Sequence, residues 1–189
     1  MIDGIVLAGG YSSRAKINKM MMLYKNKPLI SQAIETMHQF CEVVIVVTGY
    51  YHDEMNDFLK TYNFVKVIYN ENYSEGMFSS IKKGVKEVAN DFFIIPGDYP
   101  KIKPSTYKEI LDTTGDIRVP SFNYHLGHPI FFKKEFKQKL LDTKYSNLKE
   151  FRNHYDFTII EVFDDGVLID VDYIKDLEKL IEGNDGFDS

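Results

Sequence analysis

Short runs of consecutive apolar residues alternate with longer stretches in which apolar residues recur every three or four positions. Continuous apolar runs are typical of strands buried on both faces, and the longer stretches are typical of amphipathic helices. In the first half of the chain the expected strands are residues 2–7, 42–48, 64–69 and 92–96. The expected helices are residues 28–40, 53–62, 77–88 and 105–112. This alternation predicts an α/β fold: a doubly wound, mostly parallel sheet in a three-layer α/β/α arrangement.

The second half of the chain has a less regular pattern. Its expected strands are residues 117–120, 129–132, 157–162 and 167–171, with a polar loop at residues 121–128. Its expected helices are residues 133–141 and 173–181. Because neither a repeat nor a linker-like stretch divides the chain, we expect one domain over residues 1–182. Residues 183–189 are expected to form a polar tail.

Composition and charge exclude several classes of protein. The chain has 189 residues and a net charge of −5, and its 23 Lys and Arg residues are scattered along the sequence. Nucleic-acid binding is not expected, because it normally requires a concentrated basic face. No apolar run approaches the roughly 18 residues of a membrane span, and no signal-peptide pattern is present, so we expect a cytoplasmic protein without membrane association. Cys41 is the only cysteine, which excludes an intramolecular disulfide.

The segment after the first expected strand has the composition of a phosphate-binding loop. It comprises Leu7, Ala8, Gly9, Gly10, Ser12, Ser13, Arg14 and Lys19. Adjacent glycines let the backbone approach a ligand closely and leave amide groups free to donate to phosphate oxygens. The two cations add charge-assisted contacts to a triphosphate. Neither a G-x-G-x-x-G fingerprint nor a Walker A sequence is present, and the alternative for Gly9 and Gly10 alone is a tight turn.

At these residues the sequence resembles the NTP-transferase fold, and within it the MobA/MocA-like molybdenum cofactor nucleotidyltransferases. Further segments in the same order carry the resemblance: LAGGYSSR at 7–14 with Lys19, KPLI at 27–30, GMFSSI at 76–81, GDYP at 97–100, GHP at 127–129 and DVD at 170–172. The chain departs from the family pattern at Ala15 and Lys16, where the family has Met-Gly.

The resemblance implies a Mg²⁺ site formed by two carboxylates. Asp98 stands in the position of the first metal ligand, and Asp172 in that of the second. Asp170 is the weaker candidate, because in the expected strand it shares a face with Asp172 but lies two residues deeper. The structural alternatives are a turn-capping role for Asp98 and a helix N-cap role for Asp172.

The same resemblance implies roles for residues of two other segments. Gly76, Ser79 and Ser80 are expected to contact the nucleotide, although both serines equally suit a helix cap. His128 is expected to line the acceptor or base pocket, and its alternative is a loop histidine without a role in binding.

The implied activity is Mg²⁺-dependent transfer of an NMP from an NTP to a phosphate-monoester acceptor, with Arg14, Lys19 and Asp98 as catalytic residues. The acceptor implied by the family is molybdopterin, and a molybdoenzyme client is an implied partner. The GHP and DVD segments favour CTP over GTP, whereas Gly9 and Gly10 resemble the guanylyl branch. The alternatives are transfer to a sugar phosphate or phosphocholine, and a non-catalytic protein that binds the nucleotide or cofactor and helps insert it into a client enzyme.

Overall fold

The computed structural model describes residues 1–10 and 17–182 of the chain. The expected α/β pattern of the first half is confirmed. Its strands are β1 (Ile2–Ala8), β4 (Val43–Thr48), β5 (Val65–Tyr69) and β6 (Asp91–Pro96). Its helices are α1 (Ile30–His38), α2 (His52–Leu59), α3 (Met77–Glu87) and α4 (Pro104–Asp112). Between β1 and α1 lie a 3-10 turn, η1 (Lys19–Met21), and a small hairpin of β2 (Leu23–Tyr24) and β3 (Lys27–Pro28).

The second half extends the same sheet. It contains β7 (Ile117–Phe122), β8 (His125–Leu126), β9 (Ile130–Phe132), α5 (Phe136–Asp142), α6 (Leu148–Asn153), β10 (Thr158–Glu161) and α7 (Ile174–Glu182). The order across the sheet is β10-β7-β9-β6-β1-β4-β5, with β8 paired to β7. The pairs from β6 through β1 and β4 to β5 are parallel, while β9 pairs antiparallel with both β6 and β7. The sheet is therefore mostly parallel, as expected.

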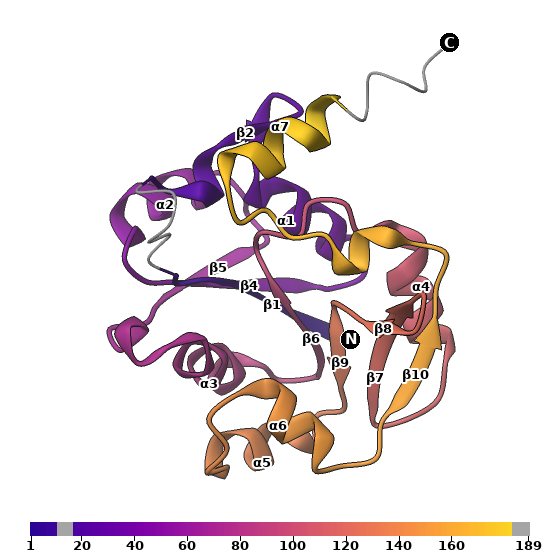
Figure 1. The fold of residues 1–189 in the computed structure, drawn as a ribbon. Coiled ribbons are helices and arrows are strands. Elements are labelled where there is room, and N and C mark those ends of the chain that lie inside the picture. The colour runs from indigo at the N-terminus through magenta and orange to yellow at the C-terminus, as the bar shows by residue number, and fades with distance from the viewer. Residues whose placement is uncertain (11–16, 183–189) are drawn as a thin grey trace.

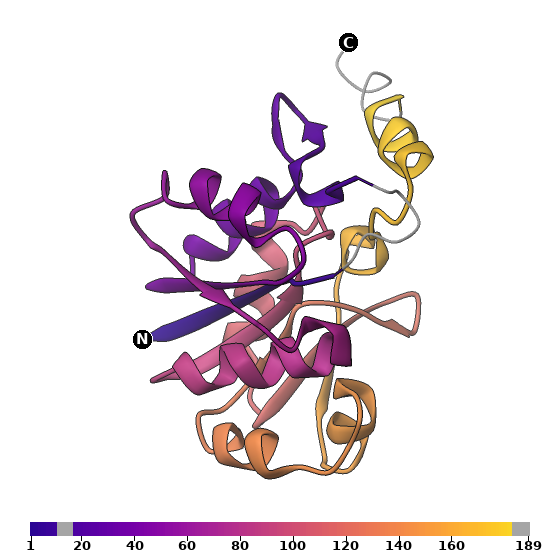
Figure 2. The same cartoon turned by 90° about the vertical axis from the view of Figure 1, so that its left-hand side faces the viewer.

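Alternating residues of the strands face two separate hydrophobic layers, as the three-layer prediction requires. On β1, Val6 and Ala8 face the layer under α1, α2 and α4, whereas Ile5 and Leu7 face the layer under α3, α5 and α6. Figure 1 and the turned view in Figure 2 show helices covering both faces of the twisted sheet. A third, smaller cluster lies apart from these layers, where α7 packs on the β2–β3 hairpin.

Three expectations for the second half are wrong or incomplete. The loop expected at residues 121–128 contains the end of β7 and all of β8, which form a hairpin with positive φ at Asn123 and Tyr124. Helix α6 was not expected, because its six residues are too few to show a helical period. The strand expected at residues 167–171 is wrong.

The segment expected as a strand at residues 167–171 is instead η3 (Asp165–Leu168) followed by extended chain. Asp164 initiates this turn, because its carboxylate accepts hydrogen bonds from Gly166 N and Thr106 Oγ. Val167 and Val171 are fully buried, and their burial rather than a strand produces the apolar spacing in the sequence.

The topology places the carboxyl ends of β1 and β6 side by side. After β1 the chain forms β4 and β5 on one side of β1, and it later forms β6 on the other side of β1. The strand order therefore reverses direction between β1 and β6. Leu7 is paired with Pro96, and Gly97 N donates to Leu7 O at 2.9 Å just beyond the paired residues. Ligands of open α/β sheets bind at such a switch point.

Gly84 allows α3 to pack closely on the sheet, and this contact predicts the effect of Gly84→Ala. The added Cβ would lie 2.7 Å from Ile5 Cγ2 and 3.0 Å from Val47 Cγ2, both on buried strands. Gly→Ala at an open helix position stabilises by about 1 kcal/mol, whereas overpacking costs about 1–3 kcal/mol. We expect a net loss of stability in urea unfolding. Lys86→Ala, on the exposed side of the same helix, is the matched control, and a Gly84→Ala protein as stable as this control would contradict the packing.

Candidate active site

A cavity of about 360 Å³ lies at the switch point between β1 and β6. Its lining combines the end of β1, the start of α3 and the segment after β6. The lining residues are Leu7, Gly9, Gly10, Lys19, Met20, Tyr73, Ser74, Gly76, Met77, Ser80, Pro96 and Asp98. Seven residues predicted from the sequence are thus brought together: Leu7, Gly9, Gly10, Lys19, Gly76, Ser80 and Asp98. Ala8 instead faces the core, and Ser12, Ser13 and Arg14 lie outside the described residues.

Glycines bring the backbone after β1 into close contact with its neighbours. A Cβ at Gly9 would lie 2.7 Å from Ser80 Oγ, and one at Gly49 would collide with Gly9 O. Gly49 follows the neighbouring strand β4, so three chain segments pack through glycine at this edge of the sheet. Gly49 is not among the residues predicted from the sequence, although a glycine directly after a buried strand is the signal that identifies such a position.

Buried Asn70 fixes the start of α3 beside the glycine loop. Its Nδ2 donates to Ser79 Oγ at 2.8 Å and to Ser80 Oγ at 2.9 Å. Gly76 has a φ of 101°, which glycine adopts without strain and which turns the chain into the helix. Ser79 does not line the cavity, and its hydroxyl is hydrogen-bonded to the carbonyls of Asn72 and Gly76. Ser80 faces the cavity, so the two serines have different surroundings.

Three carboxylates converge beside the cavity. Asp98, Asp170 and Asp172 each offer an oxygen within 4.8 Å of the others. The backbone hydrogen bond from Val171 N to Asp98 O, at 2.9 Å, holds the two segments together. The sequence predicted that Asp170 lies two residues deeper than Asp172 along a strand. The segment before Asp170 is η3 and extended chain instead of a strand, and Asp170 lies in the cluster with Asp172. The Asp98 Oδ1 atom is buried and accepts no hydrogen bond within residues 1–10 and 17–182.

Lys19 is the cation that faces these carboxylates among the described residues. Its Nζ lies 2.6 Å from Asp98 Oδ2 and 3.2 Å from Asp172 Oδ1. Burial alone would lower the pKa of Lys19, but the two carboxylates raise it above its ordinary value. The pKa of Asp170 is raised by partial burial and by repulsion from Asp98 and Asp172. The raised pKa of Asp170 is the electrostatic sign of excess negative charge in this cluster.

The third hydrophobic cluster explains how residues more than 150 positions apart meet at Lys19. Val171 and Leu177 pack against Tyr24 and Leu29. These contacts hold α7 and the segment before it beside the β2–β3 hairpin (Figure 1). Asp172 lies inside this anchored segment and is thereby carried to Lys19.

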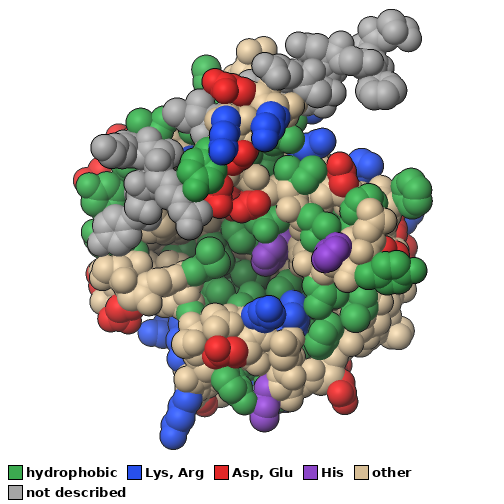
Figure 3. Space-filling model, in the orientation of Figure 1, with side chains coloured by type: hydrophobic (Ala, Val, Ile, Leu, Met, Phe, Trp, Pro, Cys, Tyr) green, Lys and Arg blue, Asp and Glu red, His purple; other side chains and the backbone are tan. Residues whose placement is uncertain are grey.

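A second cavity, of about 540 Å³, adjoins the first. The two share Leu7, Met77 and Pro96 in their linings. The other lining residues of the second cavity are Phe78, Ile81, Ile94, Tyr124, His125, Leu126, Gly127, His128, Ile130, Asn147, Leu148, Lys149 and Arg152. Figure 3 shows the hollow with a hydrophobic floor, acidic side chains above it and basic side chains below it. His128, predicted from the sequence, is in this cavity, and its ring contacts Tyr99 at a centroid distance of 4.9 Å.

Within the described ranges, no helix is long and apolar enough to cross a membrane.

Comparison with proteins of known sequence gives relatives over most of the chain. The molybdenum cofactor cytidylyltransferase of Escherichia coli (strain K12) is 28% identical over 174 residues, covering 90% of this chain and 91% of that protein. A protein named "Probable molybdenum cofactor guanylyltransferase" from Natranaerobius thermophilus is also 28% identical, over 167 residues, covering 80% of this chain and 79% of that protein.

Comparison with solved structures confirms the fold. The structure of Rv0371c from Mycobacterium tuberculosis H37Rv superposes with a TM-score of 0.81 at 21% identity, covering 96% of this chain and 97% of that one. The structure of the same protein in complex with manganese has a TM-score of 0.76 at 21% identity, covering 96% of this chain and 98% of that one. The model of the MobA-like NTP transferase domain matches residues 4–156, and the chain therefore belongs to this family.

Proposed function

We propose that this chain transfers an NMP, with CTP preferred as donor, to the phosphate of a molybdopterin-type acceptor and releases pyrophosphate. The observation that carries the proposal is the meeting of the glycine loop, Lys19 and Asp98 in one cavity. Asp170 and Asp172 lie close to Asp98, and a second, larger cavity adjoins the first. Membership of the family and the curated relatives support nucleotidyl transfer in molybdenum cofactor biosynthesis. The direct hand-over of the product to a molybdoenzyme client is part of the proposal.

The acidic cluster fits a divalent cation such as Mg²⁺. Hard cations of this kind prefer carboxylate oxygens together with phosphate oxygens, and the buried, unpartnered Asp98 Oδ1 is such a ligand. Among the described residues, three carboxylates face one cation, that of Lys19, so a divalent ion would balance the local charge. Asp98 and Asp172 would hold the ion, with Asp170 as a further ligand. When bound, it would neutralise negative charge on the triphosphate.

The remaining parts of the first cavity suit a nucleotide. Backbone amides at Gly9 and Gly10 and at the start of α3 provide neutral donors to anionic oxygens. Lys19 provides a fixed positive charge beside them, and Arg14 is proposed as a second cation on the departing pyrophosphate. The hydroxyl of Ser80, held by Asn70, is proposed to contact the nucleoside.

The larger cavity is proposed to hold the acceptor. An acceptor phosphate oxygen attacks the α-phosphorus, the bond from the α-phosphorus to the bridging oxygen breaks, and pyrophosphate leaves with that electron pair. An ionised phosphate monoester needs no general base, so the proposed reaction gives His128 no proton-transfer role. Burial of the ring, and secondarily the charge of Arg152, lower the pKa of His128 to about 4, so the ring is neutral at pH 7. We propose that His128 is a neutral wall of the acceptor pocket.

The preference for CTP rests on the GHP segment at 127–129 and the DVD segment at 170–172. The two curated relatives, one named for cytidylyl and one for guanylyl transfer, are equally identical to the chain. The cytidylyltransferase covers more of it, at 90% against 80%.

Asp98→Asn tests the metal site. The amide keeps the side-chain shape but removes the charge that attracts a cation and pairs with Lys19. We expect metal-dependent pyrophosphate release to fall about 100-fold or more, with circular dichroism unchanged. Asp165→Asn, an exposed acid outside the cluster, should keep full activity. Equal turnover of both variants would remove Asp98 from the site, and no pyrophosphate release by the unmodified protein with any acceptor would refute transfer itself.

A thermal-shift panel tests the choice of nucleotide. CTP, GTP, UTP and ATP are compared with and without Mg²⁺. A ligand that binds only the native state stabilises it by about 2.7 kcal/mol at 100 times its dissociation constant, so Tm should rise by several degrees. We expect the largest rise with CTP and a smaller one when Mg²⁺ is omitted. A larger rise with GTP would overturn the preference for CTP, and four equal shifts would refute selectivity for the base.

The lowered pKa of His128 predicts a pH dependence of stability. Between its folded pKa of about 4 and its ordinary value of about 6.5, the unfolded chain binds the proton more readily. The free energy of unfolding therefore decreases as pH falls from about 6.5 to about 4, because the unfolded state gains the proton first. At pH 4.5 the cost is on the order of 2 kcal/mol. In urea unfolding, His128→Gln should lose less stability between pH 7 and pH 4.5 than the unmodified protein. His125→Gln, exposed on the β7–β8 hairpin, is the control, and identical pH profiles for all three proteins would contradict the prediction.

A further inference from the structure

Arg152 is a buried cation that has no carboxylate partner among the residues that the structure describes. It lies on α6, and only 8% of its surface is exposed. Its guanidinium carbon lies over the ring of Phe157, 4.9 Å from the ring centroid. Its guanidinium donates from Nε, at 3.2 Å, and from Nη2, at 2.9 Å, to a single acceptor, Asn153 Oδ1. Within residues 1–10 and 17–182, no carboxylate lies within 4.0 Å of it, and Nη1 donates no hydrogen bond. Burial of the guanidinium lowers the pKa of Arg152.

The other buried arginine shows what a structural role requires in this protein. Arg118 donates to the carbonyls of Gly115, Ile110 and Leu111 at 2.8, 2.9 and 3.3 Å, and lies over the ring of Phe131. Those contacts tie β7 to the end of α4. Arg152 makes no comparable set of bonds. A buried charge without a counter-ion is costly, and an anion that binds beside it recovers part of that cost.

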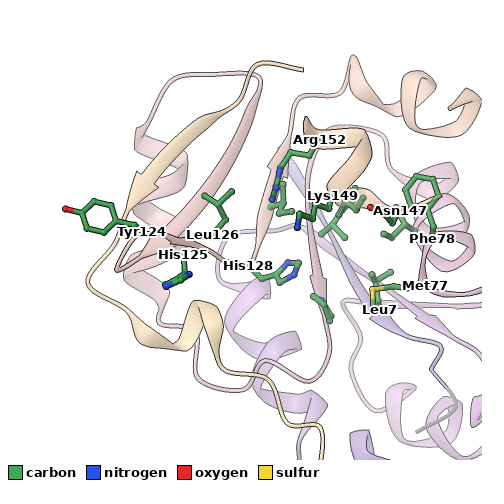
Figure 4. A pocket seen from close by; sticks show the side chains of 16 residues that line it. Leu7, Met77, Phe78, Tyr124, His125, Leu126, His128, Asn147, Lys149 and Arg152 are labelled. Carbon is green, nitrogen blue, oxygen red and sulfur yellow. The ribbon is translucent and has the colours of Figure 1, made fainter. Parts of the chain in front are cut away.

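The surroundings of Arg152 identify where such an anion would come from. Arg152 and Lys149 both line the larger cavity, and Figure 4 shows their side chains next to each other with the His128 ring below them. Lys149 has no salt bridge to any described residue. No Asp or Glu is among the described residues that line this cavity, while its floor is apolar. A bound molecule therefore meets an apolar surface and two free positive charges.

These charges lie apart from the place where the acceptor phosphate must react. Neither Arg152 nor Lys149 lines the smaller cavity that holds Lys19 and Asp98. The two cavities share only apolar Leu7, Met77 and Pro96 among their described lining residues. Figure 3 shows the same separation, with acidic side chains at one end of the hollow and basic ones at the other.

We propose that Arg152, assisted by Lys149, binds a second anionic group of the acceptor, distinct from the phosphate that attacks the nucleotide. The acceptor class is then a phosphate monoester with an apolar body and an anionic group at its far end. This inference rests on the proposed function, because it takes the larger cavity as the acceptor site. Arg152 acts as a specificity-determining residue and takes no part in the chemical step.

The first test measures binding without turnover. The probe is 8-anilinonaphthalene-1-sulfonate, which joins an apolar aromatic body to one anionic group, and its fluorescence is titrated with Arg152→Met, Arg152→Lys and the unmodified protein. A charge-assisted hydrogen bond predicts a roughly 10- to 100-fold weaker affinity for Arg152→Met and partial recovery for Arg152→Lys. Lys139→Met removes a charge on α5 that does not line the cavity and should bind as the unmodified protein does. Equal affinity of Arg152→Met and the unmodified protein would overturn the proposal.

Stability without ligand separates this role from a structural one. Methionine keeps the apolar contact with Phe157 but removes the unpaired charge, so the Tm of Arg152→Met should equal or exceed that of the unmodified protein. A Tm lowered by several degrees would indicate a structural arginine and would contradict the inference.

Kinetics provides the third readout. With an acceptor that supports turnover, Arg152→Met should raise the acceptor KM about 10- to 100-fold and leave the KM for CTP unchanged. An equal rise in both KM values would refute a role confined to the acceptor. If the unmodified protein turns over no acceptor, the proposed function fails, whereas the binding test still decides whether Arg152 is an anion-binding residue.

Discussion

The ion pairs of Lys19 with Asp98 and Asp172 are the contacts on which the site depends. They join three segments that are distant in sequence: the turn after β1, the end of β6 and the chain before α7. Coulomb attraction between partly buried charges is stronger than at the surface, so Lys19 holds two carboxylates close together despite their repulsion. The hydrogen bond from Val171 N to Asp98 O also holds the segment of Asp172 next to Asp98. The packing of Leu177 with Tyr24 and Leu29 anchors α7, which follows that segment.

A second constraint is the close approach of backbone segments beside these charges. Gly9 contacts both Gly49 and Ser80, and Asn70 holds Ser80 in place by a buried hydrogen bond. A side chain at Gly9 would clash with Ser80 of α3, and one at Gly49 would clash with the backbone of Gly9, so either would displace the loop. The charged cluster and the glycine contacts therefore form two different walls of the same cavity. One wall is charged, and the other is shaped by closely packed backbone.

The larger cavity has the opposite electrostatic character. Arg152 and Lys149 line it, and no Asp or Glu is among its described lining residues. Figure 3 shows the apolar floor of the hollow between acidic and basic side chains. His128 remains neutral there because burial and the charge of Arg152 lower its pKa. Under the proposed function, this separation of charge would orient an elongated acceptor, with the reacting phosphate toward the acidic cluster and the remainder of the molecule toward α6.

The sequence by itself determined the α/β class and the long strands and helices of the first half, and it singled out seven of the twelve described residues that line the smaller cavity. Buried parallel strands and a glycine loop after β1 leave strong local patterns. It missed α6 and misread residues 167–171, since six helical residues show no period and the burial of Val167 and Val171 imitates a strand. Only the tertiary structure placed Asp170 in the acidic cluster and left Arg152 buried with no counter-ion in the described part of the chain. Both depend on which distant groups meet in space, and spacing along the chain does not encode the pairing of charges.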